Sequence, residues 1–269
     1  MSLDLNPISA WRRMLAQPND SRSKTIAIAF LTAAVCALLV TAATVTLRPI
    51  QAANRAAEQQ ARLESLIAAI PGMSDLLSQS GDAALSTVVV DLETGRATSE
   101  ITPDTLAETL ENPANRTALT PAQDLADLGS RPDYSQIFIL RRGEGGPVDL
   151  VILPVAGAGY DGVIQAMIAL RGDMRTIAGM TVTSQSETPG LGARITEPAW
   201  QAQFAGRPAV DDGGTVRLAV ARGRAATEYE VDGITGATRT SNAITNMMRF
   251  WLGPDGYGPL LDAIRRGDF

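Results

Sequence analysis

The sequence predicts an α+β protein with a single N-terminal transmembrane helix. A domain with one twisted, mainly antiparallel sheet and flanking helices follows it. Three observations lead to this fold class. An unbroken apolar run covers Thr25–Leu47, short β-branched runs separated by turn residues follow, and apolar residues recur at helical spacing after Thr240. With 269 residues, 45% of them hydrophobic, the chain is long enough for a large core.

The apolar run Thr25–Leu47 contains no charge, glycine or proline. As a helix it would be about 34 Å long, enough to cross a hydrocarbon core of about 30 Å. A cleaved signal peptide is the alternative, but its apolar part is usually about 7–15 residues long and follows a short basic segment. Here 24 residues precede a longer run, so we expect a retained anchor.

Basic residues are denser on the N-terminal side of this run. Four precede it and three are spread out after it: Arg12, Arg13, Arg22 and Lys24, then Arg48, Arg55 and Arg62. Lys and Arg concentrate on the cytoplasmic side of a span. We therefore expect a cytoplasmic segment 1–24, a transmembrane helix 25–47 in the lipid bilayer of a bacterial inner membrane, and a periplasmic domain 48–269.

Composition excludes several kinds of chemistry. The chain has no His, so it has no Ser-His-Asp triad, His-ligated haem or His-containing zinc site. Its one cysteine, Cys36, lies in the apolar run, which rules out an internal disulfide and a Cys-ligated iron–sulfur cluster. The net charge of −6 argues against nucleic acid as a partner. Any redox chemistry must therefore come from a bound organic cofactor.

The expected sheet comes from β-branched runs bounded by Gly, Asp or Pro. We predict strands at Ser86–Leu92, Gln136–Leu140, Asp149–Val155, Gly162–Leu170 and Ile177–Thr183, with shorter ones at Val216–Val220 and Glu228–Val231. The short links between them favour antiparallel pairing. Around the strands, composition predicts a helical stalk over Gln51–Ile70 and a polar, helix-prone stretch over Thr105–Leu128, with breaks at Pro113 and Pro121.

The C-terminal part changes to helical spacing. Ile244, Met247, Met248 and Trp251 fall on one face of a helix, which Gly253-Pro254-Asp255-Gly256 ends, and Leu260–Arg266 predicts a last short helix. Trp251 and Tyr257 are interpreted as core residues. Outside this region, Arg171 and Arg194 are interpreted as solvated side chains, and Asp211-Asp212 as part of a loop.

The segment from Asp232 to Ser241 reads DGITGATRTS. It predicts a tight turn of small and hydroxylated residues leading into a helix that begins near Ser241. Free backbone N–H groups at a helix start attract anions, and small side chains at Gly236 and Ala237 let a bulky group approach the backbone. The simpler interpretation is an ordinary capped turn with Thr240 or Ser241 as N-cap.

This segment resembles the flavinylation motif of flavin-carrying subunits of the sodium-translocating NADH:quinone oxidoreductase, of their Rnf relatives and of related FMN-binding domains. In that motif a flavin transferase joins the phosphate of FMN to the hydroxyl of the last Thr. The resemblance implies FMN bound covalently to Thr238 as a phosphoester. It further implies that Asp232, Thr235, Gly236 and Ala237 are motif positions, the first two serving recognition or orientation by the transferase.

Two other segments resemble the same families. Ser186–Gly192 contains ETPGLG, similar to a loop that packs against the flavin, and the ending WLGPDGYGPLL resembles the C-terminus of the covalent-FMN subunit of the sodium-translocating enzyme. The loop implies that Leu191 covers a ring face and that Thr188 hydrogen-bonds its polar edge. The cofactor-binding residues expected from this loop are Glu187, Thr188, Gly190, Leu191 and Gly192.

The resemblance implies an electron-transfer subunit that relays electrons between redox centres, with the other membrane subunits of the oxidoreductase as partners. The chain has no dinucleotide motif and one expected span, so we do not expect it to bind NADH or quinone itself. Two alternatives stay open at this point. They are the FMN subunit of an Rnf-type ferredoxin:NAD oxidoreductase, and a tethered binding or scaffold domain whose turn is merely structural.

Overall fold

The computed structural model describes residues 83–143 and 145–269, together with residues 16, 18, 21, 22, 24–41, 44 and 46 of the N-terminal segment. The chain forms two compact units, Met1–Ala61 and Arg62–Phe269. The predicted stalk Gln51–Ile70 lies outside the described residues, and the boundaries 1–24, 25–47 and 48–269 stay predictions.

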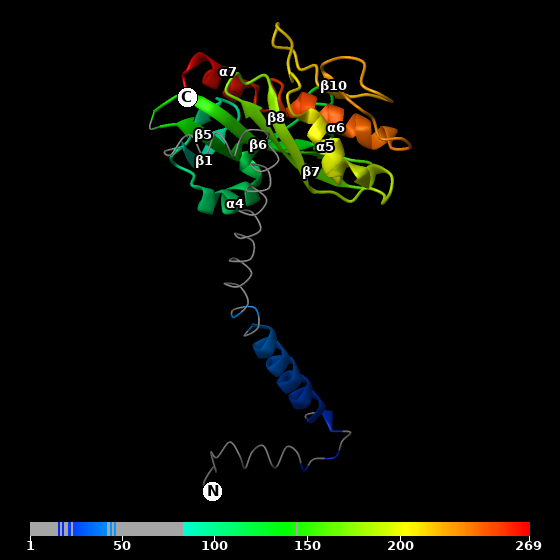
Figure 1. Ribbon diagram of the computed structural model, residues 1–269. Coiled ribbons are helices and arrows are strands. Elements are labelled where there is room, and N and C mark those ends of the chain that lie inside the picture. Colours follow the sequence, from blue (N-terminus) through cyan, green and yellow to red (C-terminus); the bar gives the residue numbers. More distant parts are fainter. Residues whose placement is uncertain are drawn as a thin grey trace. The chain divides into compact units, whose positions relative to one another are not determined.

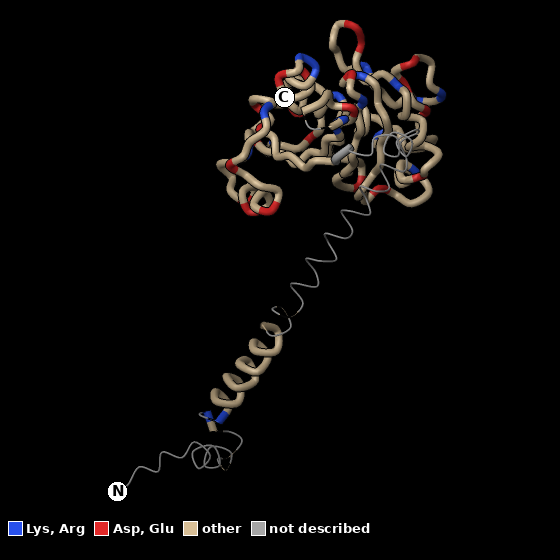
Figure 2. The backbone as a smooth tube through the Cα atoms, turned by 60° about the vertical axis from the view of Figure 1, so that its left-hand side comes forward, with Lys and Arg blue, Asp and Glu red and all other residues tan. Residues whose placement is uncertain are grey.

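The described residues of the N-terminal unit include one apolar helix, which overlaps the span 25–47 expected from the sequence. Lys24–Thr41 has a mean hydropathy of 2.1, so by length and composition it can cross a membrane. Figure 2 shows basic residues at its N-terminal edge and none along its length. The Thr32 hydroxyl donates to the Ile28 carbonyl at 2.9 Å, which satisfies a polar group within the helix as an apolar environment requires.

The larger unit contains a six-stranded sheet in which every neighbouring pair is antiparallel (Figure 1). Its spatial order is β2-β1-β5-β6-β7-β8. The strands are β1 Ala83–Asp91, β2 Arg96–Ala97, β5 Tyr134–Arg142, β6 Val148–Ala158, β7 Val163–Arg171 and β8 Ile177–Ser184. The five longer strands predicted from the sequence are all present, and their antiparallel pairing is confirmed.

Side chains alternate between the two faces of this sheet, as the strand period requires. One face carries the main core, where residues such as Ile137, Leu153 and Ile168 are fully buried. The amphipathic helix α6, Thr238–Trp251, lies against β6 and contributes Ile244 and Met247 to the same core. Burying each side chain of this size contributes about 1.5–3 kcal/mol. The opposite face has a smaller cluster, Leu140, Leu150, Ile152, Ala169 and Ala178.

The C-terminal segment closes the core with two aromatic residues. Beyond Ile152, β6 no longer pairs with β5, so its carbonyls need other donors. The Tyr257 hydroxyl donates to the Pro154 carbonyl at 2.8 Å, and the Trp251 indole N–H donates to the Ala156 carbonyl at 2.6 Å. Both side chains are buried, which confirms their predicted core role. Helix α7, Gly258–Arg266, follows as expected.

Two helix predictions need correction. The stretch Thr105–Leu128 is helical only at its start, because α4 spans Pro103–Glu111 and Thr102 caps it with a capping box. After the short helix η1, Pro113–Asn115, the chain turns into β3, Arg116–Ala118, which pairs with β4, Ser130–Pro132. The second correction concerns the start of α6 and is described with the site.

The two shorter strands are present as the parallel pair β9, Ala219–Val220, and β10, Glu230–Val231.

Candidate flavin site

Helix α6 begins at Thr238, three residues earlier than predicted. Its N-cap is Ala237, no side chain caps it, and the first helical bond runs from the Ser241 N–H to the Ala237 carbonyl at 2.9 Å. Thr240 and Ser241 are therefore not N-caps but buried residues of the first turn. Thr238 is exposed at the first helical position. The N–H groups of this turn, unlike those of a capped helix, are left for an external acceptor.

The turn before α6 brings the two sequence motifs into contact. Gly236 adopts a φ of +79°, and the Ala237 N–H donates to the Ile234 carbonyl at 3.0 Å. A Cβ on Gly236 would lie 3.1 Å from Cδ2 of Leu191. Ala237 and Ile234 are buried beneath the turn, whereas Thr235 and Gly236 are exposed. The absence of a side chain at Gly236 therefore allows both this backbone conformation and the close approach of Leu191 in the ETPGLG loop.

The buried side chain of Glu187 holds this arrangement in place. Glu187 is 4% exposed, and its Oε2 accepts from the Thr240 hydroxyl at 2.5 Å. Its Oε1 accepts from the backbone N–H groups of Tyr160 and Asp161 at 2.7 and 3.3 Å. One buried carboxylate thus joins the β6–β7 turn, the ETPGLG loop and the first turn of α6. Because the carboxylate is enclosed and satisfied, it acts by holding these three segments together.

Two glycines leave room for that carboxylate. A Cβ on Gly192 would lie 2.5 Å from Oε2 of Glu187 and 2.5 Å from the Thr240 hydroxyl oxygen. A Cβ on Gly159 would overlap Oε1 of Glu187. Gly190, by contrast, has a φ of +76° and open space around it, so it serves the turn geometry.

The rest of the ETPGLG loop is held by its own backbone and by the neighbouring turn. The N–H groups of Leu191 and Ala193 both donate to the Thr188 carbonyl at 3.1 Å. The Thr188 hydroxyl donates to Oδ2 of Asp161 at 2.5 Å, so its proton is already used within the protein. Leu191 points outward and is 44% exposed. The exposed Leu191 side chain therefore offers an apolar surface beside the turn that precedes α6.

Asp232 holds the approach to the motif. Its carboxylate accepts from the Ala225 N–H at 2.7 Å, and its carbonyl accepts from the Trp200 indole N–H at 2.9 Å. Its own N–H donates to Oε1 of Gln203 at 3.0 Å. In the folded chain the side chain of Asp232 therefore stabilises the loop that precedes the turn.

The β6–β7 turn, residues 159–162, contributes to the site in a way not expected from the sequence. Tyr160 is 54% exposed, and the guanidinium carbon of Arg239 lies 5.1 Å from the centre of its ring. The glycine-rich sequence GAGYDG could have marked this turn, although its last glycine was expected only as the start of a strand. Arg194, in contrast, pairs with Glu197 at 3.0 Å, and this hydrogen bond raises the pKa of Arg194. Within the described ranges, no cluster of three acidic or Cys residues could hold a metal ion.

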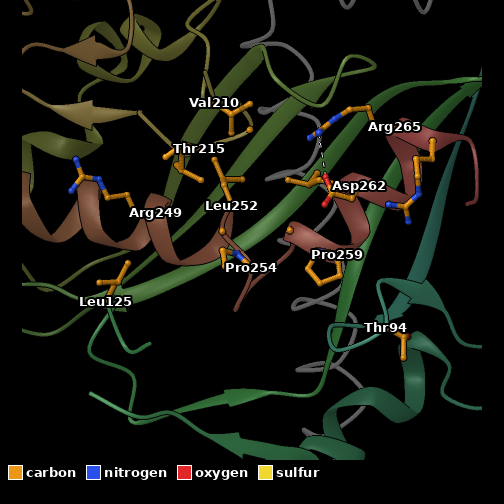
Figure 3. Close-up of a pocket in the computed structure, with 16 residues that line it drawn as sticks. Thr94, Leu125, Val210, Thr215, Arg249, Leu252, Pro254, Pro259, Asp262 and Arg265 are labelled. Carbon is orange, nitrogen blue, oxygen red and sulfur yellow. Dashed lines mark ion pairs between the residues drawn. The ribbon is translucent and has the colours of Figure 1, made fainter. Parts of the chain in front are cut away.

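A separate cavity lies at the C-terminal end of α6 (Figure 3). It has a volume of about 800 Å³, and its lining includes Arg249 of α6 and the C-cap residue Leu252, together with Val210, Thr215 and Asp262. Asp262 pairs with Arg265 at 3.2 Å. No residue of the two motifs lines this cavity, so it is not part of the candidate flavin site.

Comparisons with known proteins agree with this geometry. The model of the FMN-binding domain family matches residues 159–253, from the β6–β7 turn to just beyond the end of α6. The chain is 34% identical over 259 residues to the C subunit of the Na(+)-translocating NADH-quinone reductase of Yersinia pestis, covering 93% of this chain and 95% of the relative. It belongs to this C-subunit family. The counterpart of Pseudomonas aeruginosa is 32% identical, with 93% and 98% covered.

The fold of this family is also found in a solved structure. The crystal structure of Shewanella oneidensis NqrC matches with a TM-score of 0.64 at 22% identity, covering 78% of this chain and 99% of that chain. The expected α+β fold class and the resemblance carried by the motifs are both confirmed. The names of the relatives favour the sodium-translocating family over the Rnf alternative.

Proposed function

We propose that this chain is the membrane-anchored electron-transfer subunit of a sodium-translocating NADH:quinone reductase, with FMN bound covalently to Thr238 as a phosphoester. The observation that supports this proposal is the contact between the two motifs around the start of α6, where Thr238 is exposed, although the ETPGLG loop lies 46 to 51 residues before Thr238 in the chain. When bound, FMN supplies reversible electron transfer, which no side chain of this protein provides.

The residues around Thr238 suit a phosphate ester. The hydroxyl is exposed, and the free N–H groups of the first helical turn carry the positive end of the helix dipole. An anion at that position is stabilised by about 0.3–1 kcal/mol on an exposed helix end, and by more when partly buried. Because no side chain caps α6, these donors are available to the phosphate oxygens.

The surrounding residues divide into two groups. Leu191 and Tyr160 are exposed and offer apolar surface to the flavin, with Gly190 shaping the loop that presents Leu191. Glu187, Gly192 and Thr188 keep the loop in place. Asp232, Thr235, Gly236 and Ala237 set the conformation of the turn that a flavin transferase must recognise before it modifies Thr238.

We further propose the topology predicted from flanking charge. The N-terminus lies in the cytoplasm, the apolar helix crosses the inner membrane, and the flavin domain lies in the periplasm. A covalent bond suits this location because a dissociating cofactor would be lost from the cell envelope. The other membrane subunits of the reductase donate electrons to the flavin and accept them from it, and the chain has no substrate site of its own.

Mass spectrometry of the full chain purified from its native membranes tests the attachment. We expect an added mass of about 438 Da, FMN minus water, and in-gel flavin fluorescence. Thr238→Ala should lose both. Thr227→Ala removes an exposed hydroxyl outside the motif and should keep both. A bare polypeptide mass for the wild-type chain would refute covalent attachment, and an unchanged added mass in Thr238→Ala would refute the assigned residue.

A further inference from the structure

Arg239 and Tyr160 form an exposed stacked pair beside the proposed attachment residue. The guanidinium carbon of Arg239 lies 5.1 Å from the centre of the Tyr160 ring, within the range of a cation–π contact. Arg239 directly follows Thr238 in α6, whereas Tyr160 belongs to the β6–β7 turn. Within the described part of the chain, no carboxylate forms an ion pair with Arg239, although the chain as a whole is acidic.

The buried carboxylate of Glu187 fixes both partners of this pair. It accepts from the N–H of Tyr160 itself and from the hydroxyl of Thr240, the residue after Arg239. The two backbones are therefore held at a set separation, with the guanidinium carbon of Arg239 over the Tyr160 ring. A planar cation and a half-exposed ring are thus presented together next to Thr238.

This placement differs from that of a phosphate ligand. Phosphate on Thr238 already has the free N–H groups of the helix start, whereas the guanidinium is directed onto the aromatic ring. Tyr160 is one of four large hydrophobic side chains outside the N-terminal helix that the described structure leaves exposed, and Leu191 is another. A planar ring system tethered at Thr238 would cover such surface and meet the cation at its edge.

We infer that Arg239, stacked on Tyr160, contacts the flavin ring and raises its reduction potential by stabilising the negative charge of the reduced form. This inference rests on the proposed attachment of FMN to Thr238. One electron enters the flavin from the preceding redox centre of the complex and later leaves to the next one. In both steps no bond to the protein forms or breaks.

A guanidinium fits this role for a physical reason. The interaction of a fixed positive charge with a charge that appears only on reduction favours the reduced state alone. An Arg side chain also stacks on aromatic faces while its edge stays free to donate hydrogen bonds. Arg239 therefore acts electrostatically, and we expect its substitution to change the reduction potential of the flavin.

Redox titration of the purified full-length chain tests the inference, with flavin absorbance as the readout and the covalent load checked by mass. Arg239→Gln should shift the equilibrium of one-electron reduction at least tenfold toward the oxidised form, a potential about 59 mV more negative. Arg239→Lys should recover most of the shift because it keeps the charge. Arg171→Gln, which removes an exposed arginine at the end of β7, should leave the potential unchanged.

The potential is read only on the flavin that is attached, so a variant with a reduced load still reports. A loaded Arg239→Gln chain with the wild-type potential would overturn this inference and leave the attachment to Thr238 standing. An equal shift in Arg239→Lys and Arg239→Gln would also overturn it, because charge would then not be the cause. A wild-type chain without covalent flavin would overturn the proposed function itself.

Discussion

The two ends of helix α6 differ in how they use their polar groups. At its C-terminal end, Trp251 and the following Tyr257 are buried and donate to carbonyls of β6. At its N-terminal end, Thr238 is exposed and no side chain caps the helix. The difference indicates that the C-terminal end secures α6 to the sheet. The N-terminal end is then free to hold a ligand.

This division has a physical basis. Fully satisfied aromatic anchors resist local opening, so they can hold a helix whose other end lacks a cap. A missing cap costs about 1 kcal/mol, which is less than the contribution of one buried aromatic side chain. At the open end, Glu187 compensates by tying Thr240 to the neighbouring loop and turn. Substitutions at the C-terminal end should therefore mainly lower the free energy of unfolding, whereas substitutions at the N-terminal end should also lower the amount of attached flavin.

The largest expected effect is at the anchored end. Trp251→Ala should lower the free energy of unfolding by about 3–5 kcal/mol, because it leaves a cavity in the core and an unpaired Ala156 carbonyl. Denaturant titration of the full chain in detergent measures this loss. Chains that remain folded should still carry flavin. A loss of attached flavin without a loss of stability would contradict the division between the two ends.

A smaller effect on stability is expected at the open end. Glu187→Gln replaces one acceptor oxygen with an amide donor that faces the groups now donating to the carboxylate, so we expect a loss of about 1–3 kcal/mol. Because the substitution loosens the turn around Thr238, the fraction of chains with covalent flavin should also fall. The same two measurements, denaturant titration and intact mass, report both changes.

Glu197→Gln is the matched control for that substitution. Glu197 is an exposed partner of Arg194, and exposed ion pairs contribute about 0–1 kcal/mol. Stability and flavin load should both stay close to wild type. If Glu187→Gln behaved like this control, the buried carboxylate would not hold the site together.

The smallest effect is a dependence of stability on alkaline pH. Burial raises the pKa of the Tyr257 hydroxyl above its ordinary value of 10.0, so the folded state retains this proton after the unfolded state has released it. The contribution of the neutral hydroxyl is fully present below pH 10 and declines as the pH rises further, by at most about 1.4 kcal/mol per pH unit. Tyr257→Phe should remove that part of the slope when unfolding is measured between pH 9 and 11, and an unchanged slope would contradict it.

Local sequence pattern by itself determined much of this protein. The length and composition of Thr25–Leu47 predict the apolar helix, and β-branched runs predict all five longer strands, because these signals depend on neighbours in sequence. The run around Thr238 is also short and ordered, and its resemblance to the flavinylation motif predicts the attachment of FMN there. The core roles of Trp251 and Tyr257 also followed from their residue type and position.

Tertiary structure decided where α6 begins and what Glu187 does. Thr240 looked like a helix cap, but its hydroxyl donates to a carboxylate 53 residues away, so the helix starts at Thr238 instead. The pairing of Tyr160 with Arg239 likewise joins a turn and a helix that no sequence period relates. A local pattern specifies which conformation a segment prefers, whereas a hydrogen bond between distant segments exists only once the sheet has brought them together.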